Sequence, residues 1–368
     1  MRDHPILLAA GGTGGHLFPA LALAEELIRR EWRIELATDM RGDRFGSGFP
    51  ASTIHRISSA TIKGRSPIAI ARTGLSLVNG IRQAYALIGT MRPAAVVGFG
   101  GYPCFPPLVA ARLRGVATAL HEQNAVLGRA NRMLVNGVTA IATSFEDVQF
   151  IDENLKPKVH LTGNPVRDIV VEHAATPYPT PPSAGSSGQF RLLVFGGSQG
   201  ARFFSELVPS ALSQLDEVTR ARLNITQQCR DEDLEAARAT YARAGIDAEC
   251  ATFFQDLPRR IAASHLVMGR AGASSIAELT VIGRPSILVP LPHSLDNDQL
   301  RNAISLADAG GAICIAQKDL TAERLRADLH TILSDPENLI AAATNAKSRG
   351  RPDAVVRLAD LVEELAGH

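Results

Sequence analysis

Residues 270–278, RAGASSIAE, could bind both a phosphate and a vicinal diol. The small residues open a helical pattern that Gly283 and Pro285 end. A helix N-terminus offers backbone N–H groups that bind phosphate. One turn inside, the carboxylate of Glu278 can accept hydrogen bonds from a diol such as that of a ribose. The same carboxylate could also stabilise the helix dipole with no ligand present.

A second glycine-rich stretch, GGTGGH at 11–16, follows a short buried strand and precedes a helix from Pro19. Its glycines indicate that something approaches the backbone closely. His16 stands at the loop–helix junction, where it could be a catalytic base or a histidine that caps the helix. The stretch is out of register with a G-x-G-x-x-G fingerprint, although Asp39 is suitably spaced for a ribose acid. An NAD site is therefore disfavoured.

Polar residues also follow two other predicted strands. The strand from Val116 ends in HEQN at 121–124, and a polar loop, 293–299, follows a strand at 286–290. Because ligands of parallel sheets bind beyond the carboxyl ends of the strands, we expect Glu122 and Asn124 on the same side as His16. The polar loop could read further hydroxyl groups.

Both halves of the chain begin with a strand, a glycine loop and a helix; in the second half this pattern starts at residue 190. Such alternation is typical of doubly wound parallel sheets. We predict an α/β protein of two Rossmann-like domains that face each other across a cleft. Their limits are residues 1–171 and 190–350, joined by a Pro/Ser/Gly-rich linker at 172–189. A C-terminal helix over 351–368 is expected to return to the N-terminal domain.

The composition, 45% hydrophobic and 20% charged over 368 residues, predicts an ordinary globular protein of two domains. The four cysteines lack metal-ligand spacing, which argues against a zinc site or a disulfide framework. The N-terminal apolar run is too short for a signal peptide, and no stretch reaches the ~18 apolar residues of a membrane span.

Basic residues concentrate in residues 41–121, where ten of them stand against one acid, Asp43. Such a region usually meets nucleic acid, an anionic bilayer or a phosphorylated substrate. Within it, residues 61–91 interleave apolar positions with Lys63, Arg65, Arg72 and Arg82. This pattern fits a membrane-surface patch, although a core helix with a solvated basic face is its commoner source.

Six motifs, in order along both halves, closely resemble one bacterial family. They are GGTGGHLFPALALA at 11–24, GFGGYP at 98–103, HEQNAVLGRAN at 121–131, GNPVR at 163–167, GGSQGAR at 196–202 and RAGASSIAE at 270–278. The family is that of the GT-B glycosyltransferases that transfer N-acetylglucosamine (GlcNAc) from UDP-GlcNAc to undecaprenyl-diphospho-MurNAc-pentapeptide (lipid I) and so form lipid II for peptidoglycan.

The resemblance implies a role for individual residues. The lipid acceptor would bind the N-terminal domain and UDP-GlcNAc mainly the C-terminal one, with Glu278 on the ribose and the backbone of Phe254 on the uracil. Other donor contacts would come from Thr13, Gly14, Gly15, Asn124, Arg167, Ser198, Ala273, Ser274, Ser275, Ile276 and Ala277. The family usually has two adjacent glutamines where this chain has Asp298 and Gln299, so the sugar-reading residue is expected at Gln299 with Asp298 as the alternative.

The implied reaction inverts the sugar and needs one base, for which His16 is the first candidate and Glu122 the rival. Helix N-termini and Arg167 would stabilise the leaving UDP in place of a metal ion, and no cofactor is implied. Alternatives are a UDP-GlcNAc 2-epimerase and a non-catalytic UDP-sugar-binding protein. We expect a peripheral enzyme on the cytoplasmic face of the plasma membrane. Its partners would be an anionic membrane surface and other cell-wall synthesis proteins, and we expect no nucleic acid.

Overall fold

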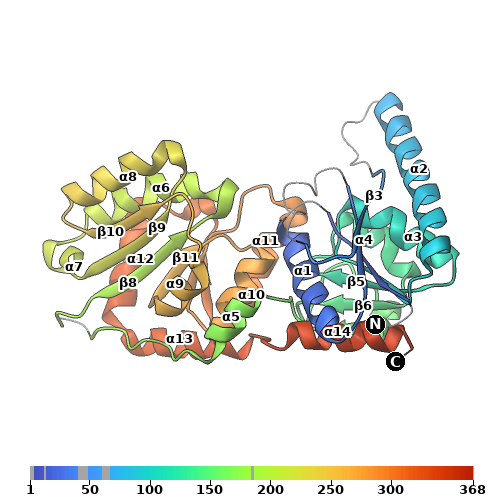
Figure 1. The fold of residues 1–368 in the computed structure, drawn as a ribbon. Helices are drawn as coiled ribbons and strands as arrows, with labels where there is room; N and C mark the ends of the chain where they lie inside the picture. Colours follow the sequence, from blue (N-terminus) through green and yellow to red (C-terminus); the bar gives the residue numbers. More distant parts are fainter. Residues whose placement is uncertain (1–3, 12–13, 40–48, 60–66, 184–185, 368) are drawn as a thin grey trace. The chain divides into compact units, whose positions relative to one another are not determined.

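The computed structural model describes residues 4–11, 14–39, 49–59, 67–183 and 186–367, and the ribbon in Figure 1 follows the chain. The chain forms two compact units. Residues 1–167 and 351–368 make up the first unit, and residues 168–350 make up the second. We describe each unit by itself.

The first unit is built on a parallel sheet with the strand order β3-β2-β1-β4-β5-β6-β7. Each of the central strands is a short apolar run with almost every residue buried, as expected of a sheet covered on both faces. The strands are β1 Ile6–Ala9, β2 Ile34–Thr38, β3 Thr53–Arg56, β4 Ala95–Gly98, β5 Ala117–Glu122, β6 Ala140–Thr143 and β7 Val159–Leu161.

Helices cover both faces of this sheet. Leu23 of α1 and Leu358 of α14 belong to the core on one face, whereas Ile88 of α2 and Leu108 of α3 belong to the core on the other. Figure 1 shows α2 beside α3, with which it packs extensively. The helices of this unit are α1 Gly14–Arg29, α2 Pro67–Met91, α3 Phe105–Leu113, α4 Arg129–Leu134 and α14 Ala354–Leu365.

The second unit repeats the design with a parallel sheet of order β10-β9-β8-β11-β12-β13. The predicted α/β class with two Rossmann-like sheets is therefore confirmed. Its strands are β8 Phe190–Phe195, β9 Leu223–Gln228, β10 Asp247–Ala251, β11 Leu266–Gly269, β12 Ser286–Leu288 and β13 Ala312–Cys314. Its helices are α5 Asp168–Glu172, α6 Gly197–Ser213, α7 Glu217–Ala221, α8 Asp231–Arg243, α9 Leu257–Ala263, α10 Ala273–Ile282, α11 Asp298–Asp308, α12 Ala322–Ser334 and α13 Pro336–Ser348.

The division between the units falls at residue 167, ahead of the expected boundary at 171 and of the expected linker at 172–189. The reason is that this segment packs on the second unit. The hydroxyl of Tyr178 donates to the carbonyl of His265 over 2.6 Å, and the buried guanidinium of Arg284 donates to the carbonyls of Pro177 and Ala262. Pro177 and Tyr178, at the start of the expected linker, are thus held to the second unit by part-buried hydrogen bonds.

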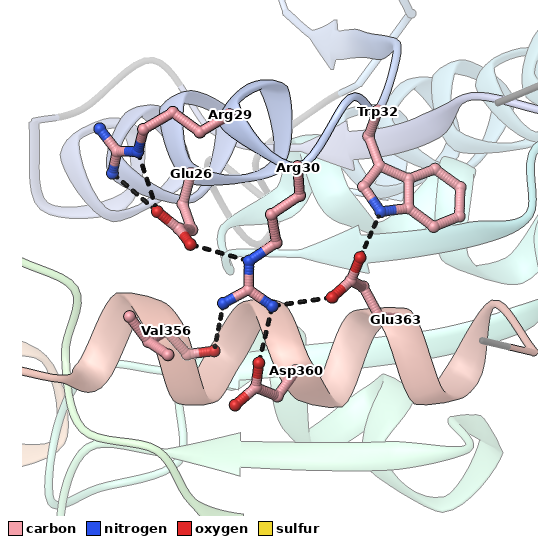
Figure 2. Close-up of polar contacts among 7 residues, drawn as sticks. All are labelled: Glu26, Arg29, Arg30, Trp32, Val356, Asp360 and Glu363. Atoms are coloured by element: carbon pink, nitrogen blue, oxygen red, sulfur yellow. Dashed lines mark hydrogen bonds and ion pairs between the residues drawn. The ribbon is translucent and has the colours of Figure 1, made fainter. Parts of the chain in front are cut away.

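α14 packs on α1 of the first unit through apolar side chains. A polar cluster beside them, shown in Figure 2, also joins the two ends of this unit. Arg30, which directly follows α1, donates to Asp360 over 2.6 Å and to Glu363 over 2.7 Å, both on α14, and its Nε donates to Glu26 over 2.7 Å. Glu363 also accepts a hydrogen bond of 2.9 Å from the indole of Trp32. One guanidinium therefore ties the end of the chain to its beginning.

We expect Arg30→Met to destabilise the first unit by about 1–3 kcal/mol, because a half-buried carboxylate cluster loses its cation. The protein has one tryptophan, Trp32, which lies within the cluster, so its fluorescence during urea unfolding reports on this unit. Arg357→Met is the matched control, since Arg357 pairs with Asp353 along α14 and is half-exposed. Equal urea midpoints for Arg30→Met and the wild type would contradict the expected role.

Candidate active site

Three loops of the first unit meet at the carboxyl edge of its sheet. They follow β1, β4 and β5 and carry the sequence motifs that begin at Gly11, Gly98 and His121. β1, β4 and β5 are adjacent parallel strands, so these loops leave the sheet side by side. The polar and glycine-rich motifs of this unit therefore lie at one edge of the sheet, where ligands of parallel sheets bind.

The ring of His16 lies against the backbone of two of these loops. A methyl group added at Gly100 would stand 3.1 Å from its Cε1, and one added at Gly101 would stand 3.5 Å from its Cδ2. Both glycines have a positive φ, 91° and 76°, which other residues rarely adopt. The thiol of Cys104 donates to the carbonyls of Ala9 and Gly100 and so fastens this loop to β1. The GFGGYP motif thus provides a slot for an imidazole.

Glu122 is buried and uses both carboxylate oxygens within its own loop. Oε1 accepts hydrogen bonds from the backbone and side-chain nitrogens of Asn124, and Oε2 accepts from the backbone of Gly128 and from Nδ2 of Asn131 over 2.8 and 2.7 Å. Burial raises the pKa of Glu122. The carboxylate therefore holds residues 122–131 together by hydrogen bonds. Of the two candidate bases, His16 is the more exposed.

Arg167 lies near the start of α1, with its guanidinium 5.9 Å from the ring centre of Phe18. The same ring lies 3.0 Å from where a methyl group on Gly14 would stand, whereas a methyl group on Gly15 would meet no described atom within 4 Å. A cation and a helix N-terminus therefore converge, which suits an anion. Thr13 lies outside the described residues.

In the second unit, α10 begins at Ala273 after Gly272, and no side chain among the described residues caps it. Ala273, Ser274, Ser275, Ala277 and Glu278 are all partly exposed, while Ile276 is buried. The first-turn N–H groups thus lack a side-chain acceptor, and Glu278 lies on the next turn. This arrangement agrees with the predicted phosphate and diol contacts.

Two buried side chains fix the loop ahead of α10. Arg270 donates to the carbonyls of Val289 and Pro290 and, over 2.7 Å, to Oε1 of Gln317. Burial lowers its pKa to about 10, so the guanidinium stays charged at neutral pH. Nδ2 of Asn302, on α11, donates to the carbonyl of Ala271 over 3.1 Å. The start of α10 is therefore held by the segment that follows β12 and by α11.

The side chains of Gln299 and Asp298, at the start of α11, have different hydrogen-bond partners. Oε1 of Gln299 accepts a hydrogen bond from the backbone of Leu291 over 2.9 Å, and a carboxylate oxygen of Asp298 accepts from the backbone of Gln299 over 2.6 Å. In the loop between Leu291 and Gln299, His293 and Asp296 have positive φ angles, a backbone conformation that is strained for residues other than glycine. The backbone of Leu291 therefore fixes the position of the amide oxygen of Gln299.

Two further predicted donor residues lie in this unit. Phe254 follows β10 and is buried, with the guanidinium of Arg260 4.3 Å from its ring centre. Ser198 lies in the first turn of α6, and its side chain is outside what the structure describes.

Sequence reasoning missed several residues that shape the site. Gln123 and His121 lie in the HEQN motif, where only Glu122 and Asn124 had been given roles. Gln123 accepts a hydrogen bond from His16, and His121 bonds Gln123 in turn. Their place in one motif was the available signal, because polar residues at the buried end of a strand need partners.

The described residues include neither a cluster of metal ligands nor a helix that could span a membrane. Within the described ranges no three His, Cys, Asp or Glu residues cluster as metal ligands would. No helix in that part of the chain is both long enough and apolar enough to cross a bilayer.

Comparison with known proteins gives matches over both units. Residues 6–143 match the glycosyltransferase family 28 N-terminal domain and residues 191–358 its C-terminal domain. MurG from Acinetobacter baumannii has a similar solved structure, with a TM-score of 0.80 and 28% identity, covering 98% of this chain and 100% of that one. The predicted GT-B class of fold is confirmed by these likenesses.

Two relatives carry the same description, UDP-N-acetylglucosamine–N-acetylmuramyl-(pentapeptide) pyrophosphoryl-undecaprenol N-acetylglucosamine transferase. The one from Chelativorans sp. (strain BNC1) is 53% identical and covers 100% of this chain and 96% of its own length. The one from Rhodopseudomonas palustris (strain HaA2) is 53% identical over the full length of both. With both halves matched in this way, the chain belongs to glycosyltransferase family 28, among its N-acetylmuramyl-(pentapeptide) pyrophosphoryl-undecaprenol N-acetylglucosamine transferases.

Proposed function

We propose that the protein transfers GlcNAc from UDP-GlcNAc to the 4-hydroxyl of the muramyl sugar of lipid I, giving lipid II. The observation that carries this proposal is the 53% identity, over the whole chain, to relatives described as that transferase. The slot that holds His16 and the uncapped start of α10 support it. An epimerase that uses UDP-GlcNAc alone would leave the basic, apolar surface of α2 unexplained.

In this reaction the bond between C1 of GlcNAc and the β-phosphate oxygen of UDP breaks with its electron pair leaving on UDP. A bond forms between C1 and the acceptor O4 with inversion. The proton of the 4-hydroxyl passes to His16, which is partly exposed at the sheet edge. Glu122, with four hydrogen bonds already made, positions the loop instead.

Binding of the donor is assigned mainly to the second unit. The N–H groups of Ala273, Ser274 and Ser275 bind the diphosphate, Glu278 binds the ribose, and the backbone of Phe254 binds the uracil. The amide of Gln299 reads a GlcNAc hydroxyl. Further contacts come from Ser198 and, in the first unit, from Thr13, Gly14, Gly15, Asn124 and Arg167. Positive charge and helix N-termini replace a metal ion in stabilising the leaving UDP.

We also propose that the protein binds the cytoplasmic face of the plasma membrane through one surface of the first unit, the α2–α3 surface. Leu75, Val78 and Leu113 are 71%, 57% and 64% exposed there. Arg82 of α2 and Arg112 and Arg114 at the end of α3 are also exposed, and the guanidinium of Arg114 lies 3.8 Å from the ring centre of Tyr85. Exposed apolar side chains interleaved with arginine suit an anionic lipid surface, and other cell-wall synthesis proteins would meet the enzyme there.

The transfer itself is tested with radiolabelled UDP-GlcNAc and a short-chain lipid I analogue in the presence of EDTA. Wild type should transfer GlcNAc, and His16→Ala should lose about 10²- to 10⁴-fold in rate while keeping its affinity for UDP-GlcNAc. The exposed His330 provides the matched control, His330→Ala. Transfer that survives in His16→Ala would move the base to Glu122. Conversion of UDP-GlcNAc to UDP-ManNAc without transfer would overturn the proposal.

The ribose contact is tested by pairing Glu278→Ala with a UDP-GlcNAc analogue that lacks the ribose 2′-hydroxyl. Wild type should bind the analogue about 10- to 100-fold more weakly, because a hydrogen bond to a charged group is lost. Glu278→Ala should bind both compounds equally weakly. Glu337, also near a helix N-terminus, supplies the control Glu337→Ala. If Glu278→Ala still discriminates between the two compounds, Glu278 does not bind the ribose and only stabilises the helix through its dipole.

Membrane binding is tested by sedimentation with vesicles that contain anionic lipid and with zwitterionic vesicles. Val78→Glu should weaken binding to the anionic vesicles about tenfold or more, because an apolar contact is replaced by a repelled charge. Val218, 71% exposed on α7 of the second unit, gives the matched control Val218→Glu. If Val78→Glu binds as wild type does, the α2–α3 surface is not the docking site.

A further inference from the structure

A chain of hydrogen bonds runs from His16 into the core of the first unit. Nδ1 of His16 lies 3.0 Å from Oε1 of Gln123, and Nε2 of Gln123 lies 2.9 Å from Nδ1 of His121. At the far end, Nε2 of His121 lies 3.0 Å from the carbonyl oxygen of Gly163. Gln123 and His121 are buried, at 1% and 0% exposure. Neither has a role in the proposed chemistry so far.

The orientation of the Gln123 amide is set by backbone carbonyls. Its Nε2 donates to the carbonyls of Phe99 and His121, each over 3.0 Å. A carbonyl oxygen can only accept, so the nitrogen of the amide must face these two groups. The amide oxygen must then face His16. Reversing the amide would set Oε1 against two other oxygen atoms inside the core, where such repulsion is costly.

This orientation determines which nitrogen of His16 carries the proton. An amide oxygen has no hydrogen to give, so Nδ1 of His16 must be the donor in their contact. In the neutral ring the other nitrogen, Nε2, then keeps its lone pair. We propose that Gln123 is a positioning residue for the transfer reaction: its amide oxygen holds the proton of His16 on Nδ1 and so leaves Nε2 as the base.

His121 supports this arrangement from inside the core. Its Nε2 faces a carbonyl oxygen and must donate, which leaves Nδ1 as an acceptor that faces Nε2 of Gln123. That amide nitrogen has two hydrogens for three acceptors, so Nδ1 shares one of them with a backbone carbonyl. Burial lowers the pKa of His121 to about 4, so the ring is neutral at physiological pH and can act as that acceptor. The ring also lies 5.5 Å from that of Phe99, centre to centre. The carbonyl of Gly163 therefore orients His121, which together with two backbone carbonyls orients Gln123.

The role of His16 as a base rests on the proposed function. Which of its ring nitrogens carries the proton can be measured without the reaction. The protein is labelled with ¹⁵N-histidine, and long-range ¹H–¹⁵N correlation distinguishes protonated from unprotonated ring nitrogens. A spectrum of His16→Gln identifies the signals of His16 among the ten histidines. At a pH where the ring is neutral, Nδ1 of His16 should be protonated and Nε2 unprotonated. Protonation of Nε2 would overturn the proposal.

The variant Gln123→Met keeps the length of the side chain and removes the acceptor. Its His16 should shift toward the Nε2-protonated form, and kcat for GlcNAc transfer should fall about 10- to 100-fold. KM for UDP-GlcNAc should stay within about twofold, since the donor contacts are left intact. Gln149→Met, at an exposed position of the same unit, is the matched control.

An unchanged kcat or an unchanged Nδ1-protonated His16 in Gln123→Met would overturn the positioning role. If circular dichroism shows that this variant does not fold, the wild-type spectrum alone decides between the two tautomers. If the wild type transfers no GlcNAc, the proposed function fails. The spectra of the wild type and of Gln123→Met still establish whether Gln123 keeps the proton of His16 on Nδ1.

Discussion

The site in the first unit depends on the close approach of an imidazole ring to backbone. His16 fits between the loops after β1 and β4 because the second loop has no side chains at Gly100 and Gly101. Any larger residue would clash with the ring or strain the loop. The glycines leave space for the ring in more than one orientation, and the hydrogen bond to Gln123 selects one of them. Packing provides the space and a buried amide provides the direction.

Much of the fold could be predicted because short apolar runs and glycine loops are local signals. The strand at Ile6–Ala9 and the loop after it were readable from adjacent residues, as was the uncapped start of α10 at Gly272. The same local signals placed Glu122 and Asn124 at the sheet edge beside His16. Periodicity and turn chemistry suffice for such features, since each is decided within a few residues.

Features that depend on partners distant in sequence could not be predicted. Proline-rich residues 173–189 look like a linker until Arg284, about a hundred positions away, is seen to bind their carbonyls. Gln123 looks like a spacer within HEQN until Phe99 and His16 are seen on either side of its amide. In both cases a buried polar group has partners that are distant in the sequence, so the neighbouring residues do not identify those partners.

The first unit is assembled from two stretches of chain, with the whole second unit inserted between them. A ribosome therefore makes α1 early and α14 only after the second unit, a delay of roughly 15 to 65 seconds at ~5–20 residues per second. During that interval the apolar side of α1 that faces Leu358 and Val362 has no cover. The unit that carries His16 is thus completed last, and the nascent chain must keep that surface from aggregating while the second unit folds.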